Sequence, residues 1–193
     1  CGAEIDFVDI ESESFNMSPV ALAAKLELAK KSNRLPKVII PVHMGGQSCD
    51  MQAIGSLAQQ YGIKVIEDAS HAIGGTYNSQ RIGNCAHSDI TIFSFHPVKI
   101  ITTGEGGMAV TQDEGLAHSM RMLRSHGITR DATEFEFGND GPWYYEQQEL
   151  GFNYRLTDIA AALGLSQLQR IDSFIHQRNS IAARYNEAFA STL

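Results

Sequence analysis

Short apolar runs alternate with helix-like segments along most of the chain, and this alternation limits the fold more than any other feature. The run 38–42 reads Val-Ile-Ile-Pro-Val, and a continuous apolar run predicts a strand buried on both faces of a parallel sheet. Ser18 and Pro19 precede it as the N-cap and first residue of a helix that reaches about Lys31. Strands that alternate with helices in this way predict an α/β domain with a mostly parallel central sheet flanked by helices.

The remaining elements follow from the same patterns. Further strands are expected at 5–10, 65–66, 90–95 and 108–110. Further helices are expected between Asp50 and Gly62, over 113–124, and over 157–189 as one bent or two successive helices. The polar and aromatic segment 128–151 has no sustained period and is predicted to be a long functional loop.

Composition excludes several classes of protein. The formal net charge of −7 argues against duplex DNA or an anionic membrane as the main partner, because both require a basic face. Three widely spaced cysteines form neither a disulfide framework nor a zinc pattern, so no metal site and a reducing cytoplasm are expected. No apolar run approaches the roughly 18 residues that span a membrane.

Unusual residues follow two of the expected strands, at the sheet edge where ligands bind in such folds. Glu67 and Asp68 follow one strand; acidic residues there are often only helix caps. Lys99 follows the next expected strand, and a lysine after a strand is usually a solvated surface residue. Pro97 makes a stiff corner before Lys99, and an amine set among apolar residues can act as a nucleophile. A lysine and an aspartate are the two charged groups that a pyridoxal-phosphate site needs.

Four segments occur in an order that is similar to the DegT/DnrJ/EryC1/StrS sugar aminotransferases, and the resemblance covers nearly the whole chain. They are Pro41-Val42-His43, the run from Glu67 to Ala72, the run from Phe93 to Lys99 with Gly104–Gly107 behind it, and the run from Gly151 to Asp158. The resemblance implies the large domain of a fold type I pyridoxal-phosphate enzyme, similar in fold to aspartate aminotransferase.

The resemblance also implies roles for individual residues. Lys99 is expected to carry the cofactor as a Schiff base and to move the proton, and Asp68 to pair with the pyridinium nitrogen. His71 is expected to pack on the cofactor ring or reach its 3-hydroxyl, and Ser94 to bind its phosphate. Asn153 matches a residue that reaches the phosphate in the neighbouring subunit, which implies a homodimer with shared active sites.

Three further residues are weaker candidates for substrate binding. His96 is expected near the sugar, and His43 is either a structural histidine at a strand end or a residue that lines the site. Tyr144 lies in a Trp-Tyr-Tyr run that is either core, interface or a surface that stacks on uracil. Gly104–Gly107 lacks the spacing of a nucleotide-binding loop and is predicted to be a tight turn near the dimer interface.

Within the family, the lysine segment and the loop 141–146 resemble the branch that serves pseudaminic acid biosynthesis. That resemblance implies ping-pong transfer of an amino group from glutamate to a 4-keto-6-deoxy UDP-sugar, with 2-oxoglutarate as the other product.

The chain is shorter than the family pattern. We expect residues 1–193 to be a truncated cofactor-binding large domain without the N-terminal phosphate-loop segment and the C-terminal small domain, with 157–193 starting the helical connection. As a whole polypeptide it would bind the cofactor weakly and transaminate little, so a non-catalytic relic or fragment is one alternative. A pyridoxamine-dependent sugar dehydratase is another, but those enzymes have histidine where Lys99 stands. A dinucleotide-dependent dehydrogenase is more distant, since its glycine fingerprint is missing.

Overall fold

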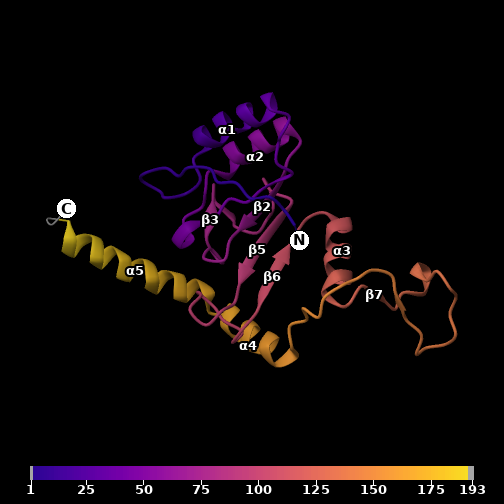
Figure 1. Cartoon of the computed structure of the whole chain (residues 1–193). Coiled ribbons are helices and arrows are strands. Elements are labelled where there is room, and N and C mark those ends of the chain that lie inside the picture. Colours follow the sequence, from indigo (N-terminus) through magenta and orange to yellow (C-terminus); the bar gives the residue numbers. More distant parts are fainter. Residues whose placement is uncertain (1, 191–193) are drawn as a thin grey trace.

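A four-stranded sheet forms the centre of the molecule in the computed structural model, which describes residues 2–190 (Figure 1). Its strands lie in the order β1 (Val38–Ile39), β2 (Lys64–Asp68), β5 (Ile90–Ser94) and β6 (Gly107–Val110). The first three run parallel, and β6 pairs antiparallel with β5 at the edge. The predicted α/β class and mostly parallel sheet are therefore confirmed.

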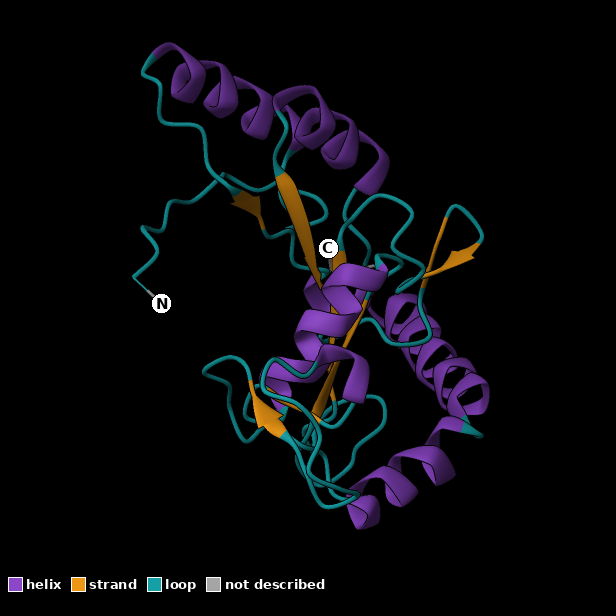
Figure 2. Cartoon of the chain, turned by 90° about the vertical axis from the view of Figure 1, so that its right-hand side faces the viewer, coloured by secondary structure: helices purple, strands orange, loops and turns teal. Residues whose placement is uncertain are grey.

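Two helices cover one face of the sheet and lie side by side in both views (Figures 1 and 2). Helix α1 (Pro19–Lys31) begins where the Ser18 hydroxyl accepts a hydrogen bond from the Ala21 N–H. Helix α2 (Met51–Tyr61) begins at Asp50 and ends at Gly62, whose φ of 67° is left-handed, as the sequence predicted. The core between helices and sheet contains these buried residues: Leu22, Leu26, Ile39, Met51, Ile54, Ala58, Ile63 and Val65.

A second apolar cluster lies beneath the ends of β2 and β5. It contains Ala69, Ala72, Ile82, Phe93, Phe95 and Ile101, with Ile171 and Phe174 packed against it. The last two belong to α5 (Ile171–Phe189), which follows α4 (Asp158–Leu168) after a short break, so the expected pair of helices is confirmed. Beyond this contact α5 runs away from the body of the molecule (Figure 1).

The remaining elements are short, apart from one helix. Helix α3 (Glu114–Arg124) starts at the N-cap Asp113, as predicted. The short elements are η1 (Met44–Gly46), the hairpin β3 (Thr76–Tyr77) and β4 (Gln80–Arg81), the pair β7 (Ile128–Thr129) and β8 (Glu146–Gln147), and η2 (Ala132–Glu134). The predicted loop 128–151 thus holds only these last three elements and projects away from the sheet (Figure 1).

Two predictions about strands were wrong. The run 5–10 forms no strand: only Ile10 makes an isolated bridge, to Met17, and no strand lies beside the rest to pair with it. The run 38–42 is buried on one face only, with Ile39 buried and Ile40 53% exposed, because the helices cover a single face of the sheet here. Pro41 has no N–H to continue the ladder, so beyond it only an isolated bridge joins Val42 to Asp68.

None of the helices in the described range 2–190 is both long enough and apolar enough to cross a membrane.

Candidate active site

The carboxyl ends of β2 and β5 bring Asp68 and Ser94 to the same face of the sheet. Asp68 pairs in register with Ile92, two residues before Ser94, and residues that pair across strands share a face. Glu67 and Thr91, one position earlier on each strand, point to the opposite, buried face. The Asp68 Oδ1 atom accepts a hydrogen bond from the Ser70 N–H at 3.1 Å, and no other described residue donates to its carboxylate.

Lys99 lies in a loop whose ends are tied together below it. The carbonyl of Phe95 accepts hydrogen bonds from the Thr103 N–H at 3.0 Å and the Thr102 hydroxyl at 2.8 Å. The Thr102 N–H donates to Gln167 Oε1 of α4 at 2.9 Å, so a helix distant in sequence fixes the loop. Lys99 itself is half-buried, and within the described part of the chain its Nζ forms no hydrogen bond or ion pair.

The glycine segment behind this loop is a tight turn, as predicted. Gly106 has a φ of 157°, and a Cβ atom there would lie 2.4 Å from the Thr103 hydroxyl oxygen, so only glycine fits. Its carbonyl accepts the Phe95 N–H at 2.8 Å, which joins the turn to the start of the lysine loop. The expectation that this turn lies near a dimer interface stays a prediction.

His71 follows β2 and lies on η1. Its Nδ1 atom accepts a hydrogen bond from the Gly45 N–H at 3.3 Å, and its imidazole is exposed. Gly46 packs so closely on the His71 carbonyl oxygen that a Cβ there would lie 2.9 Å from it. The turn 44–46 therefore supports both the backbone and the ring of His71.

A buried polar pair lies beneath this edge, on the helix-covered face. His43 is fully buried, and its Nε2 atom lies 2.9 Å from Oε2 of Glu67. The Ser88 and Thr91 hydroxyls donate to the other oxygen of Glu67. Burial raises the pKa of Glu67, but the hydrogen bonds from His43, Ser88 and Thr91 outweigh it, so the pKa lies below its ordinary value.

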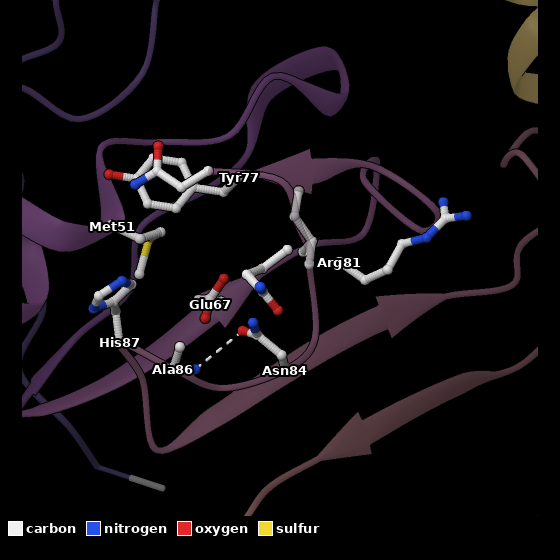
Figure 3. A pocket seen from close by; sticks show the side chains of 10 residues that line it. Met51, Glu67, Tyr77, Arg81, Asn84, Ala86 and His87 are labelled. Carbon is white, nitrogen blue, oxygen red and sulfur yellow. Dashed lines mark hydrogen bonds between the residues drawn. The ribbon is translucent and has the colours of Figure 1, made fainter.

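Sequence reasoning missed the role of Glu67, which was interpreted as a possible helix cap. The missed signal was the alternation in β2, since Glu67 shares a face with the buried Val65 and a carboxylate at such a position needs partners. Figure 3 shows Glu67 at the centre of a cavity of about 50 Å³, lined also by Met51, Tyr77 and His87. This cavity lies on the face of the sheet opposite to Asp68.

His43 was left open as a structural or a site-lining residue, and the geometry supports the structural role. The Cys49 N–H donates to its Nδ1 at 3.2 Å, so both ring nitrogens are engaged and none is left for a substrate. His96, by contrast, is exposed at the start of the lysine loop, and its Nε2 atom lies 4.0 Å from Oε1 of Glu105. It stays a candidate for contact with a substrate.

Two of the expected site residues lie away from the lysine loop. Asn153 is exposed and forms an isolated bridge with Ser125, beyond the end of α3. Tyr144 donates its hydroxyl to Oε1 of Glu146 at 2.9 Å, which raises the pKa of the tyrosine. In the Trp-Tyr-Tyr run the flanking rings, Trp143 at 68% and Tyr145 at 52%, are the exposed ones.

The residues at the sheet edge fit pyridoxal phosphate by their chemistry. Lys99 offers an amine without a partner in the described chain, and Asp68 a carboxylate with one weak neutral donor. Ser94 offers a hydroxyl whose only described contact is a 3.4 Å hydrogen bond from the His96 N–H. These are an amine for the aldehyde, an anion for the pyridinium nitrogen and a donor for the phosphate.

Comparison with known proteins gives one family over the full length. The model of the DegT/DnrJ/EryC1/StrS aminotransferase family matches residues 1–193. The spore coat polysaccharide biosynthesis protein SpsC of Bacillus subtilis is 43% identical over 97% of this chain and 46% of its own length. The UDP-4-amino-4,6-dideoxy-N-acetyl-beta-L-altrosamine transaminase of Campylobacter jejuni is 40% identical over the same shares of the two chains.

Solved structures agree with the family match. Helicobacter pylori PseC, an aminotransferase involved in the biosynthesis of pseudoaminic acid, superposes with a TM-score of 0.83 at 31% identity, over 96% of this chain and 45% of that one. The PLP form of the putative sugar aminotransferase Spr1654 from Streptococcus pneumoniae gives 0.81 at 31% identity, over 98% and 49%. The chain thus spans about half the length of the relatives that it matches.

Proposed function

The chain belongs to the DegT/DnrJ/EryC1/StrS aminotransferase family, and we propose that it is the cofactor-binding part of a pyridoxal-phosphate enzyme that aminates a nucleotide-linked keto sugar. One observation carries the proposal: Asp68 and Ser94 share one face at the carboxyl ends of adjacent strands, and the strand that ends at Ser94 leads directly into the lysine loop. The PLP and PMP forms of the structural neighbour support the choice of cofactor.

Each residue then has a defined task. Asp68 holds a negative charge for the pyridinium nitrogen, and Ser94 donates its hydroxyl to the phosphate. Lys99 would hold the aldehyde carbon covalently and, once released from it, its Nζ would move a proton between the amine-bearing carbon of the substrate and the cofactor. When bound, pyridoxal phosphate supplies the electron sink that makes this proton acidic.

The loop around Lys99 suits this task. The hydrogen bonds that join Thr102 to Phe95 and to Gln167 fix the backbone of the loop on which Lys99 lies. An amine without a competing hydrogen bond or ion pair in the described chain is free to react.

We further propose glutamate as amino donor and a 4-keto-6-deoxy UDP-sugar as acceptor, in a pathway of the pseudaminic acid type. The C. jejuni and H. pylori relatives support this choice by what their names state. SpsC is named for spore coat polysaccharide biosynthesis, so other nucleotide sugars also have to be tested as acceptors.

We place Asn153 in a homodimer, at the partner's cofactor phosphate, because it is exposed and makes no described contact with the lysine loop. We expect the enzyme in the cytoplasm, where the thiols of Cys49 and Cys85 stay free.

Borohydride reduction after incubation with pyridoxal phosphate tests the proposal. Peptide mapping is expected to find the reduced cofactor on Lys99, and not on Lys64, which is held by Asp89 at 2.7 Å. The Lys99→Ala variant is expected to lose the label while its circular dichroism stays unchanged. A folded wild-type chain without label on Lys99 would contradict the proposal and favour a non-catalytic relic.

The acceptor is tested separately on unreduced protein loaded with pyridoxal phosphate. Release of 2-oxoglutarate on addition of glutamate identifies the donor, and amination of a UDP-4-keto-6-deoxy sugar, compared with the corresponding GDP sugar, identifies the acceptor. Preference for the GDP sugar would overturn the UDP assignment and leave the cofactor assignment in place.

A further inference from the structure

The turn 43–47 is held from two sides by buried side chains, and it carries the group that orients His71. On one side the His43 ring contacts Glu67 and the Cys49 N–H. On the other side the buried amide of Asn16 accepts the Met44 N–H at 3.0 Å and donates to the Gln47 carbonyl at 2.9 Å.

The clamp also acts on the backbone of β2. The His43 N–H donates to the Asp68 carbonyl at 3.0 Å, and the Asp68 N–H donates to the Pro41 carbonyl at 2.9 Å. His43 therefore links three groups: the carboxylate of Glu67, the main chain of Asp68 and the turn that supports His71.

The hydrogen bond from the Gly45 N–H determines which nitrogen of the His71 ring carries the proton. The Gly45 N–H points to Nδ1 at 3.3 Å, so this nitrogen accepts and carries no proton. In neutral imidazole the proton then lies on Nε2, because one nitrogen donates when the other accepts. His71 thus presents an N–H donor, and not a lone pair, at the sheet edge.

We propose that His43 is a positioning residue of this enzyme: through the clamped turn 43–47 it holds His71 as the Nε2–H tautomer, ready to donate to an anionic oxygen of the bound ligand. The inference deepens the proposed function, on which the identity of that oxygen, the 3-oxygen of pyridoxal phosphate, rests. His43 touches no ligand itself, since it is completely buried.

Nuclear magnetic resonance of imidazole-¹⁵N-labelled histidine tests the tautomer directly. The chain has seven histidines, and the His71→Gln spectrum assigns the signal of His71 by its absence. The measurement is made about two pH units above the ordinary histidine pKa, so that the rings are neutral. We expect an unprotonated Nδ1 and a protonated Nε2 in the wild type, and a protonated Nδ1 there overturns the proposal without any variant.

Two variants loosen the clamp from opposite sides. His43→Asn keeps an acceptor for the Cys49 N–H but loses the donor to Glu67, and Asn16→Ala loses the acceptor for the Met44 N–H. In each we expect the tautomer ratio of His71 to shift by about tenfold toward the Nδ1–H form, as expected for the loss of one aligned hydrogen bond. An unchanged ratio in either folded variant overturns the positioning role.

Ser88→Ala is the matched control. It removes a hydrogen bond from the same Glu67 carboxylate without touching His43 or the turn. A merely structural network predicts that Ser88→Ala and His43→Asn act alike, whereas positioning predicts a tautomer shift in His43→Asn alone. Because no cofactor is needed, a failure of this test is distinct from a missing label on Lys99.

Discussion

The sheet edge and the loop 128–151 both carry residues expected in the active site, but they are held in place differently. At the edge, Asp68, His71 and Lys99 lie on segments tied to buried residues of several distant elements. In the loop, Glu146 accepts hydrogen bonds from the Glu136 and Phe137 N–H groups and from Tyr144, all of which belong to the loop. The edge is therefore ordered by the fold, whereas the loop is ordered mostly by one of its own carboxylates.

This difference separates what each region can contribute. A group fixed by the core keeps its orientation before a ligand binds, which is the condition for preorganised chemistry. A loop ordered by its own contacts can move as a unit, so it suits recognition of a variable part of a substrate. In the proposed enzyme, this contrast assigns the chemical step to the residues at the sheet edge and substrate selection to the loop 128–151.

The largest expected effect comes from removing the carboxylate below the edge. Glu67→Ala leaves the His43 ring and two hydroxyls without an acceptor, so we expect the free energy of unfolding to fall by about 3 kcal/mol. Urea unfolding measures the change. A loss below about 1 kcal/mol would show that water replaces Glu67 and that the core does not order the edge.

A smaller effect is expected at the turn itself. Gly46 has a φ of 94°, and the Cβ of an alanine would lie 2.9 Å from the His71 carbonyl oxygen. Gly46→Ala is expected to cost about 1–2 kcal/mol and to lower cofactor labelling of Lys99 under limiting cofactor. Gly62→Ala is the control, because its φ of 67° gives a similar left-handed strain while a Cβ there meets nothing within 4 Å, and Gly62 lies at the end of α2, outside the lysine loop. Equal effects of the two substitutions would remove the special role of the turn.

A weaker effect concerns pH. The folded-state pKa of Glu67 lies below its ordinary value of 4.5, so its contribution to stability is present above about pH 4.5 and is lost as the pH falls through the folded-state value. We expect the free energy of unfolding to fall over this range in the wild type and less steeply in Glu67→Gln. The titratable group that faces this carboxylate is His43, and the Ser88 and Thr91 hydroxyls beside it stay neutral. Parallel pH profiles of the two proteins would contradict the lowered pKa.

The same contrast explains how much could be predicted from the sequence. Local signals carried the helix starts at Ser18, Asp50 and Asp113, where one side chain accepts a nearby N–H. Periodicity placed β2 and β5, and the rule for parallel sheets then brought Asp68 and Ser94 to one edge. The family resemblance added the roles of these residues.

Contacts between distant segments could not be read in this way. No sequence pattern around Asn16 predicts that its amide forms hydrogen bonds with the backbone of a turn about thirty residues further along the chain. The pairing of His43 with Glu67 depends on which strands are neighbours, and the failed strand at 5–10 shows the same limit, since an apolar run becomes a strand only where a partner lies beside it. Sequence patterns predicted the elements, but the clamp on His71 came only from their arrangement.

The smallest effect on overall stability is expected in the loop. Glu146→Ala removes the acceptor of two backbone N–H groups and of the Tyr144 hydroxyl, so residues 135–146 should lose their order while the sheet keeps its own. Hydrogen exchange is expected to rise at Glu136 and Phe137 and to stay unchanged in β2 and β5, with little change in the melting temperature. Glu136→Ala is the control, because its backbone N–H still donates to Glu146 and only an exposed side chain is lost. If exchange in β5 rose together with that of the loop, the two regions would form one cooperative unit, and the assignment of chemistry to one and selection to the other would lose its physical basis.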